Sequence, residues 1–184
     1  KRFLKKQEET LSHIESLIQV LLKTSQIESG MIELKKERVN MEQLIQNAAM
    51  QLEVMLIAKN IQLEKKIEKG LYVTGDPYWL EEALLNIIKN ACEHSKQNDT
   101  IKIKAQNTPM YTELIIEDEG EGIDKKDLPH IFKRFYKSSP NKDSIGIGLN
   151  LTKSILDRTN ATIRVESKKG VYTRFIIHFY TNAI

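Results

Sequence analysis

Two asparagines four residues apart are the first sign of chemistry in this sequence. Asn86 and Asn90 lie in the stretch 76–95, DPYWLEEALLNIIKNACEHS, whose apolar residues recur at the three-and-four spacing of a helix with one buried face. Residues four apart lie one turn apart on the same side of a helix, so both amide groups can reach one ligand. An isolated pair of this kind is usually solvated surface or makes helix–loop hydrogen bonds.

Three further motifs follow this helix. DEGEG at 118–122 joins carboxylates to two glycines, IFKRFY at 131–136 joins cations to aromatic rings, and SIGIGLNL at 144–151 places glycines before an apolar run. DEGEG alone is typical of an acidic surface turn. The specific signal is the order and spacing of all four motifs.

In this order the motifs resemble the N box, first glycine box, F box and second glycine box of the ATP-binding domain of sensor histidine kinases. The resemblance runs from about Val39 to Phe179. It implies a Bergerat-type fold, an α+β two-layer sandwich with a mixed sheet and helices on one face, preceded by a long N-terminal helix. It also implies that residues 1–30 are the second helix of a dimerisation and phosphoacceptor domain, and residues 31–184 the ATP-binding catalytic domain.

Each part of an ATP site has candidate residues. Asp118 follows an apolar strand, where its carboxylate can accept a hydrogen bond from the adenine amine and would repel the guanine carbonyl. Mg²⁺ prefers hard oxygen ligands and keeps several waters, so the Asn90 amide oxygen and phosphate oxygens are a sufficient set. The helix after Gly148 has free N–H groups for phosphate oxygens. The expected nucleotide-binding residues are Asn86, Asn90, Asp118, Gly120, Gly122, Arg134, Tyr136, Lys137, Gly146, Gly148, Leu149 and Thr173.

Asn86 bears on the reaction class and is the predicted catalytic residue. In the wider superfamily that includes gyrase, MutL and the Hsp90 chaperones, a glutamate at this place activates water. An amide cannot accept a proton at neutral pH, so Asn86 argues against an ATP hydrolase and for transfer of the γ-phosphoryl group. The resemblance implies an ATP-dependent protein-histidine kinase whose phosphoryl group passes to an aspartate of a response regulator.

Three positions depart from the family pattern. Glu93 replaces a lysine or arginine, His94 replaces an aromatic residue, and Ser144 replaces the first glycine of the second glycine box. The Glu93 carboxylate could repel phosphates, assist the metal or point to solvent. These departures keep an alternative open, a degenerate nucleotide-binding interaction module that regulates a partner without phosphotransfer.

The phosphoacceptor histidine is expected outside this sequence. His13 is followed by Ile14 and Glu15, whereas the family motif continues with an acidic residue, a basic residue and a proline. His13 also lies on the wrong helix. We therefore expect the acceptor histidine before Lys1, and we expect that the fragment does not autophosphorylate alone.

Composition limits the partners. The net charge is only +3, and basic and acidic residues are interspersed, so no nucleic-acid partner is expected. No uncharged apolar run is long enough to cross a bilayer, and no signal peptide is visible. We expect a cytoplasmic domain, with the intact protein anchored in the cell membrane through upstream segments. The lone Cys92 excludes an internal disulfide and is expected to be a buried structural thiol.

The remaining pattern predicts the elements that position the site. A helix from Phe3 to Glu28 carries apolar residues near heptad positions, which pack either on the chain's own core or on a second copy in a homodimer. The polar segment 138–144 has the composition of a mobile lid or of a plain surface loop. Further helices are predicted from Asn40 through Leu56 and at 148–158, and strands at 32–39, 61–67, 71–74, 100–106, 111–117, 162–166 and 173–180.

Overall fold

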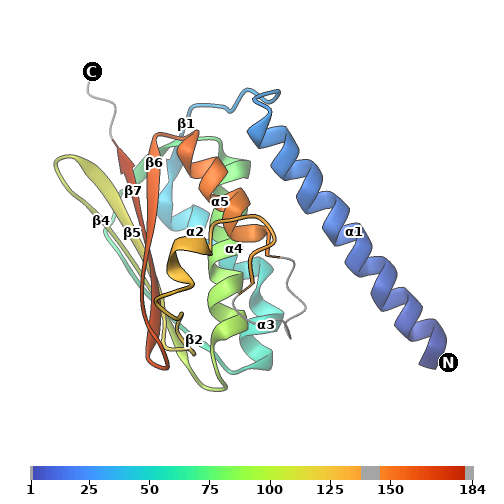
Figure 1. Cartoon of the computed structure of the whole chain (residues 1–184). Helices are drawn as coiled ribbons and strands as arrows, with labels where there is room; N and C mark the ends of the chain where they lie inside the picture. The colour runs from blue at the N-terminus through green and yellow to red at the C-terminus, as the bar shows by residue number, and fades with distance from the viewer. Residues whose placement is uncertain (1, 138–145, 181–184) are drawn as a thin grey trace.

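The computed structural model describes residues 2–137 and 146–180, so the segment 138–144, predicted as a lid or a surface loop and including Ser144, lies outside the described residues. The predicted α+β sandwich is confirmed (Figure 1). The elements along the chain are α1 (Arg2–Glu28), β1 (Glu37–Asn40), α2 (Met41–Gln51), α3 (Glu53–Ala58), β2 (Gln62–Ile67), β3 (Tyr72–Gly75), α4 (Pro77–His94), β4 (Thr100–Asn107), β5 (Tyr111–Asp118), the 3₁₀ helix η1 (Leu128–His130), α5 (Gly148–Asp157), β6 (Ala161–Lys168) and β7 (Tyr172–Tyr180).

The main sheet has five strands in the order β2-β4-β5-β7-β6. Only β2 and β4 run parallel, and the other neighbours are antiparallel. Helices α2, α4 and α5 cover one face of this sheet (Figure 1). In the β5–β7 register, Asp118 lies directly opposite Thr173. Directly opposed residues project to the same face, so these two predicted adenine residues are neighbours.

The α4 helix lies at the centre of the helical layer because its sequence favours both a firm start and a buried stripe. The Asp76 side chain accepts hydrogen bonds from the backbone N–H groups of Tyr78 and Trp79, and Pro77 occupies the first turn. One face packs into the core, and its buried residues are Trp79, Leu80, Ala83, Leu84, Ile87, Ile88, Ala91 and Cys92. The flank beside this stripe presents Asn86 and Asn90.

Two predicted elements differ from the structure by more than one or two residues at an end. The predicted helix from Asn40 through Leu56 starts correctly, since Asn40 caps Gln43, but it breaks at Leu52 into α2 and α3. Neither proline nor glycine marks this break, and no side chain caps α3. The strand predicted at 32–39 begins only at Glu37.

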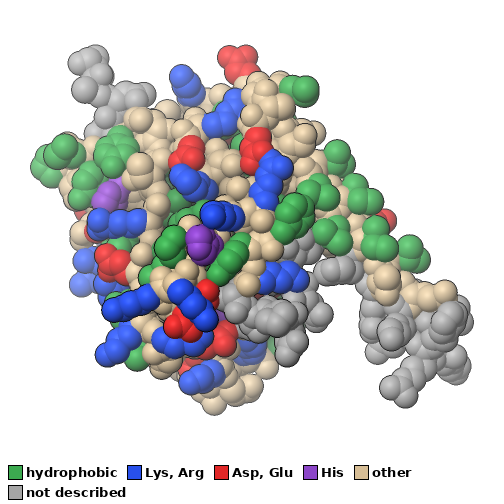
Figure 2. All heavy atoms as spheres, in the orientation of Figure 1, with side chains coloured by type: hydrophobic (Ala, Val, Ile, Leu, Met, Phe, Trp, Pro, Cys, Tyr) green, Lys and Arg blue, Asp and Glu red, His purple; other side chains and the backbone are tan. Residues whose placement is uncertain are grey.

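The apolar face of α1 is exposed between Leu11 and Leu22. Figure 2 shows apolar side chains along the projecting helix, and the exposed ones are Leu11, Ile14, Ile18, Leu21 and Leu22. Packing on the chain's own core is therefore wrong for these residues. The side chain of His13 lies outside the described part. No helix within residues 2–137 and 146–180 combines the length and apolarity that a membrane span requires.

The C-terminal end of α1 is joined to the rest of the chain. Ile27 is fully buried in a small second core with Trp79, Ala83, Leu151 and Ile155. The Arg158 guanidinium donates to the carbonyl oxygens of Ile27 at 2.7 Å and of Ile32 at 2.8 Å. These bonds tie the helix end to the segment after α5.

The Asp76 cap generates a stability prediction. Its Oδ1 serves two N–H groups of α4 at 3.1 and 3.3 Å, and its Oδ2 accepts from the Lys35 N–H at 3.1 Å. Asp76→Ala leaves these donors without a partner at a site that is only 7% exposed. We expect a loss of about 2 kcal/mol in the free energy of unfolding, measured by urea denaturation.

Two controls accompany this variant. Asp76→Asn retains one acceptor oxygen and should lose about half as much. Asp157 pairs with Lys153 on the exposed end of α5. Asp157→Ala should lower the free energy of unfolding by less than about 0.5 kcal/mol. Equal losses in Asp76→Ala and Asp157→Ala would contradict the capping role.

Candidate functional site

The Asn86 side chain of α4 faces the N-terminus of α5. A Cβ atom placed on Gly148 would lie 3.2 Å from the Asn86 Oδ1, so a glycine at this position lets the helix approach the amide. The Asn86 Nδ2 is buried and has no hydrogen-bond partner among the described residues. A buried unpaired donor is costly. An anionic oxygen bound between Asn86 and the first turn of α5 would satisfy it.

Asp118 ends β5 in a buried position. Its side chain is almost wholly buried, at 1% exposure for the residue, and its Oδ1 accepts a hydrogen bond from the Gly120 N–H at 3.0 Å. Burial raises the pKa of this carboxyl to about 7, the Gly120 N–H opposes the rise, and the charges of Asp99 and Glu117 add to it. The carboxylate therefore titrates near neutral pH.

The two glycines of the loop 118–122 are required by close backbone contacts. A Cβ on Gly120 would lie 2.3 Å from the backbone oxygen of His94, the last residue of α4. A Cβ on Gly122 would lie 2.3 Å from the backbone oxygen of Lys168, and Gly122 also has φ of +63°. No larger residue fits either position without moving the backbone.

Hydrogen bonds hold this loop on two sides. The Glu121 N–H donates to the His94 carbonyl at 3.3 Å, and the Glu121 carbonyl accepts from the Gly170 N–H at 2.7 Å. One bond joins the loop to the end of α4, and the other joins it to the β6–β7 turn. Asp118 is thereby positioned by two elements besides its own strand.

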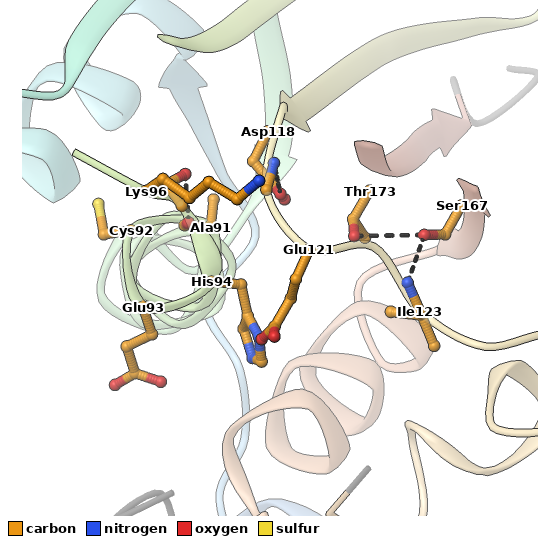
Figure 3. Close-up of polar contacts among 12 residues, drawn as sticks. Ala91, Cys92, Glu93, His94, Lys96, Asp118, Glu121, Ile123, Ser167 and Thr173 are labelled. Carbon is orange, nitrogen blue, oxygen red and sulfur yellow. Dashed lines mark hydrogen bonds and ion pairs between the residues drawn. The ribbon is translucent and has the colours of Figure 1, made fainter. Parts of the chain in front are cut away.

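Thr173 shares a small hydroxyl cluster with Ser167, which sequence reasoning did not select. Figure 3 shows Ser167 between Thr173 and the backbone of Ile123. The Ser167 Oγ lies 3.3 Å from the Thr173 Oγ1 and accepts from the Ile123 N–H at 2.8 Å. The signal in the sequence is only indirect: Ser167 pairs with Thr173 once the β6–β7 hairpin is placed in register.

Glu93 and His94, the two departures from the family pattern at the end of α4, lie in different surroundings. The His94 Nδ1 lies 2.6 Å from the Glu121 Oε1, so this ring contacts the loop that carries the two glycines. Glu93 pairs with Lys89 at 3.8 Å and points away from Asp118 in Figure 3. Of the three outcomes considered for Glu93, the structure favours orientation toward solvent.

The F box and the second glycine box meet in space. Gly146 has φ of +75°, and a Cβ there would lie 2.6 Å from the Tyr136 carbonyl oxygen. The Tyr136 hydroxyl donates to the Asp127 carboxylate at 2.8 Å. Leu149 packs against the main core, so its side chain supports α5 from within. Lys137 is exposed at the end of the first described segment.

Arg134 is engaged elsewhere in this structure. Its Nε donates to the Glu28 Oε1 at 3.2 Å, and its Nη2 pairs with the other Glu28 oxygen. The Ser154 hydroxyl donates to the same carboxylate at 3.4 Å. The predicted phosphate cation is thus held at the end of α1.

Comparison with known proteins shows one matching family and several related sequences. Residues 75–182 match the family described as histidine kinase-, DNA gyrase B-, and HSP90-like ATPase. The sensor histidine kinase GraS of Staphylococcus haemolyticus is 30% identical over 171 residues, which cover 91% of this chain and 49% of that protein. The chain spans 36–49% of the length of three curated relatives.

Solved structures agree with this match. The Acinetobacter baumannii histidine kinase AdeS is 25% identical with a TM-score of 0.78, and the alignment covers 98% of this chain and 83% of that one. Full-length ShkA, solved in complex with AMPPNP, has a TM-score of 0.84 at 21% identity and covers 99% of this chain and 39% of that one. The ShkA likeness concerns the fold.

The raised pKa of Asp118 generates a stability prediction. A carboxyl whose pKa is about 7 when folded and about 3.8 when unfolded binds more protons in the folded state between these values. Its contribution to the free energy of unfolding therefore falls as pH rises from about 4 to 8. Relative to the wild type, Asp118→Asn should gain roughly 3–4 kcal/mol over this range, measured by urea denaturation at several pH values.

The control removes a charge from an exposed position of the same loop region. Asp124 lies 4.0 Å from Lys169 with half its side chain exposed, and Asp124→Asn should change the stability difference little across the range. A stability difference for Asp118→Asn that does not change with pH would contradict the elevated pKa.

Proposed function

This chain belongs to the histidine kinase-, DNA gyrase B-, and HSP90-like ATPase family, and from this we propose that residues 31–184 bind ATP and transfer its γ-phosphoryl group to a histidine of a separate segment. The observation that carries the proposal is the unpaired Asn86 amide beside the start of α5. It supplies a donor for a phosphate oxygen and no base for water. Transfer to another nucleophile is therefore favoured over hydrolysis.

Adenine would bind beside the loop 118–122. The second Asp118 oxygen would accept a hydrogen from the adenine amine, and Thr173 lies opposite on the same face of the sheet. Gly120 and Gly122 allow the backbone to stay close to the base. Since the amine favours an ionised acceptor, base binding would lower the pKa of Asp118 and release a proton near neutral pH.

The phosphates would lie between α4 and the N-terminus of α5. The free N–H groups of the first turn of α5 would donate hydrogen bonds to phosphate oxygens. The Asn86 amide would donate to the same triphosphate. The Asn90 amide oxygen, one turn further along α4, is the best candidate to hold Mg²⁺, which when bound would neutralise phosphate charge. Lys137 would add positive charge from the exposed side.

The reaction would exchange one bond for another at phosphorus. The bond from the γ-phosphorus to the bridging oxygen breaks, a bond to the histidine ring nitrogen forms, and ADP leaves with the bridging oxygen. The chain's own contribution would be positioning and charge stabilisation. Glu82, one turn before Asn86 on α4, is paired with Lys23 at 2.7 Å and is not assigned as a base. The proton of the acceptor histidine would pass to a group on the acceptor segment.

The exposed apolar face of α1 supports a domain assignment. Residues 1–30 would be the second helix of a dimerisation and phosphoacceptor domain, and their stripe would be covered in a four-helix bundle of a homodimer. A response-regulator aspartate would receive the phosphoryl group afterwards. Anchoring of the intact protein in the cell membrane would come from upstream segments.

The nucleotide site generates a binding prediction. Calorimetry with a non-hydrolysable ATP analogue should show binding by the wild type that strengthens with Mg²⁺. Asp118→Asn should weaken binding by at least about tenfold, because a buried charge-assisted hydrogen bond is lost. Asn90→Ala should remove the Mg²⁺ effect and leave binding without metal nearly unchanged.

Lys89→Ala is the matched control for the helix. Lys89 is exposed next to Asn90 and pairs only weakly with Glu93. Its analogue affinity and Mg²⁺ dependence should match the wild type. A Mg²⁺ effect that survives in Asn90→Ala would remove Asn90 from the metal site.

The reaction class generates a second prediction. The chain with Mg²⁺ and γ-labelled ATP should label a separately supplied histidine phosphoacceptor domain, and the label should be lost in acid, as a phosphoramidate is. Alone, the chain should release little inorganic phosphate, because Asn86 is no base. The measurements are gel autoradiography and a phosphate-release assay.

The outcomes separate three functions. Steady phosphate release by the chain alone would support an ATP hydrolase and contradict the role given to Asn86. Persistent failure to label the acceptor while the analogue binds would support the alternative, a nucleotide-binding module that regulates a partner without phosphotransfer. Glu93, His94 and Ser144, which depart from the family pattern, are the residues that motivate this alternative.

A further inference from the structure

Ser167 lies at a junction of three elements beside the proposed adenine site. It occupies β6 directly opposite Thr173 of β7, and Thr173 is itself opposite Asp118 of β5. The side chains of Ser167 and Thr173 lie close together in Figure 3, next to the loop that follows Asp118. Thr173 is 3% exposed, so its hydroxyl must find its partners inside the protein or on a ligand.

The hydrogen bonds of Ser167 determine which hydroxyl donates. A serine hydroxyl has one proton and two lone pairs. The Ser167 proton goes to the Tyr172 carbonyl oxygen at 2.7 Å, because a carbonyl can only accept. One lone pair accepts from the Ile123 N–H at 2.8 Å. In the remaining contact, at 3.3 Å, Thr173 must therefore be the donor and Ser167 the acceptor.

The consequence concerns Thr173. Once its proton is directed to Ser167, the Thr173 oxygen offers only lone pairs to anything bound beside it. The neighbouring Asp118 also presents an acceptor. Its Oδ1 accepts from the Gly120 N–H, which leaves its Oδ2 for a ligand. The floor of the site thus presents two acceptors side by side.

We propose that Ser167 is a positioning residue for nucleotide specificity, which holds the Thr173 hydroxyl as an acceptor and so selects a 6-amino purine over a 6-oxo purine. The inference rests on the proposed ATP site and deepens it. The adenine amine carries two hydrogens that match two acceptors. A 6-oxo group carries only lone pairs, which face the lone pairs of Asp118 and Thr173.

The test compares ADP with inosine diphosphate, which differs from ADP at the purine 6 position and the adjoining nitrogen. Calorimetry is carried out at pH 8, above the pKa of about 7 of the Asp118 carboxyl. The wild type should prefer ADP. In Ser167→Ala the Thr173 hydroxyl can rotate and donate to the 6-oxo group, so the ADP-to-IDP affinity ratio should fall by about 3- to 10-fold.

The ratio separates positioning from simple structural support. Loss of the Ile123 bond in Ser167→Ala would weaken both nucleotides together and leave their ratio unchanged. Ser167→Thr keeps a hydroxyl at this position and should retain the wild-type ratio. Thr173→Val removes one acceptor and should also lower the ratio, and adding Ser167→Ala to Thr173→Val should change the ratio no further.

Three results would overturn the inference. An unchanged ratio in folded Ser167→Ala would remove Ser167 from specificity while leaving the ATP site in place. If Ser167→Ala does not fold, an unchanged ratio in Thr173→Val would have the same meaning. No binding of ADP by the folded wild type would overturn the proposed function, and this inference with it.

Discussion

The approach of Gly120 to the last carbonyl of α4 is the contact on which the site depends. Helix and loop meet so closely that a single added carbon at Gly120 would lie 2.3 Å from the His94 oxygen. The contact fixes the distance between the end of α4 and the end of β5, which carry the asparagines and Asp118. Gly122 repeats the arrangement against Lys168 of β6, so the loop is held between helix and hairpin.

The two ends of the site are built on different physical principles. The adenine end is positioned by backbone contacts and by a buried carboxylate, whose burial raises its pKa and costs stability at neutral pH. The phosphate end has an unpaired amide, the first turn of α5 and a cation held by another element. Stability is reduced at both ends, at one by a buried charge and at the other by an unpaired donor.

The sequence predicted the fold, and it predicted which helix, strand or loop carries most candidate residues, because these predictions rest on local signals. The cap at Asp76, the apolar stripe of α4 and the glycines beside Asp118 each follow from spacing and residue type. The ion pair of Arg134 with Glu28 joins residues 106 positions apart, and no local pattern predicts it. Ser167 was missed for a related reason, since its hydrogen-bond partners come from two other segments, β7 and the loop after β5. The break at Leu52 carries no glycine or proline signal at all.

The attachment of α1 has a mechanical consequence. The helix has 27 residues and is about 40 Å long, whereas the stretch from Val20 to Glu28 that contacts the domain spans only about 12 Å. A rod held over this length is a lever whose free arm, about 27 Å long, is roughly twice as long as its held part. A sideways displacement of the N-terminal end of α1 would produce a smaller displacement and a larger force at the attached end, where the Glu28 carboxylate pairs with Arg134.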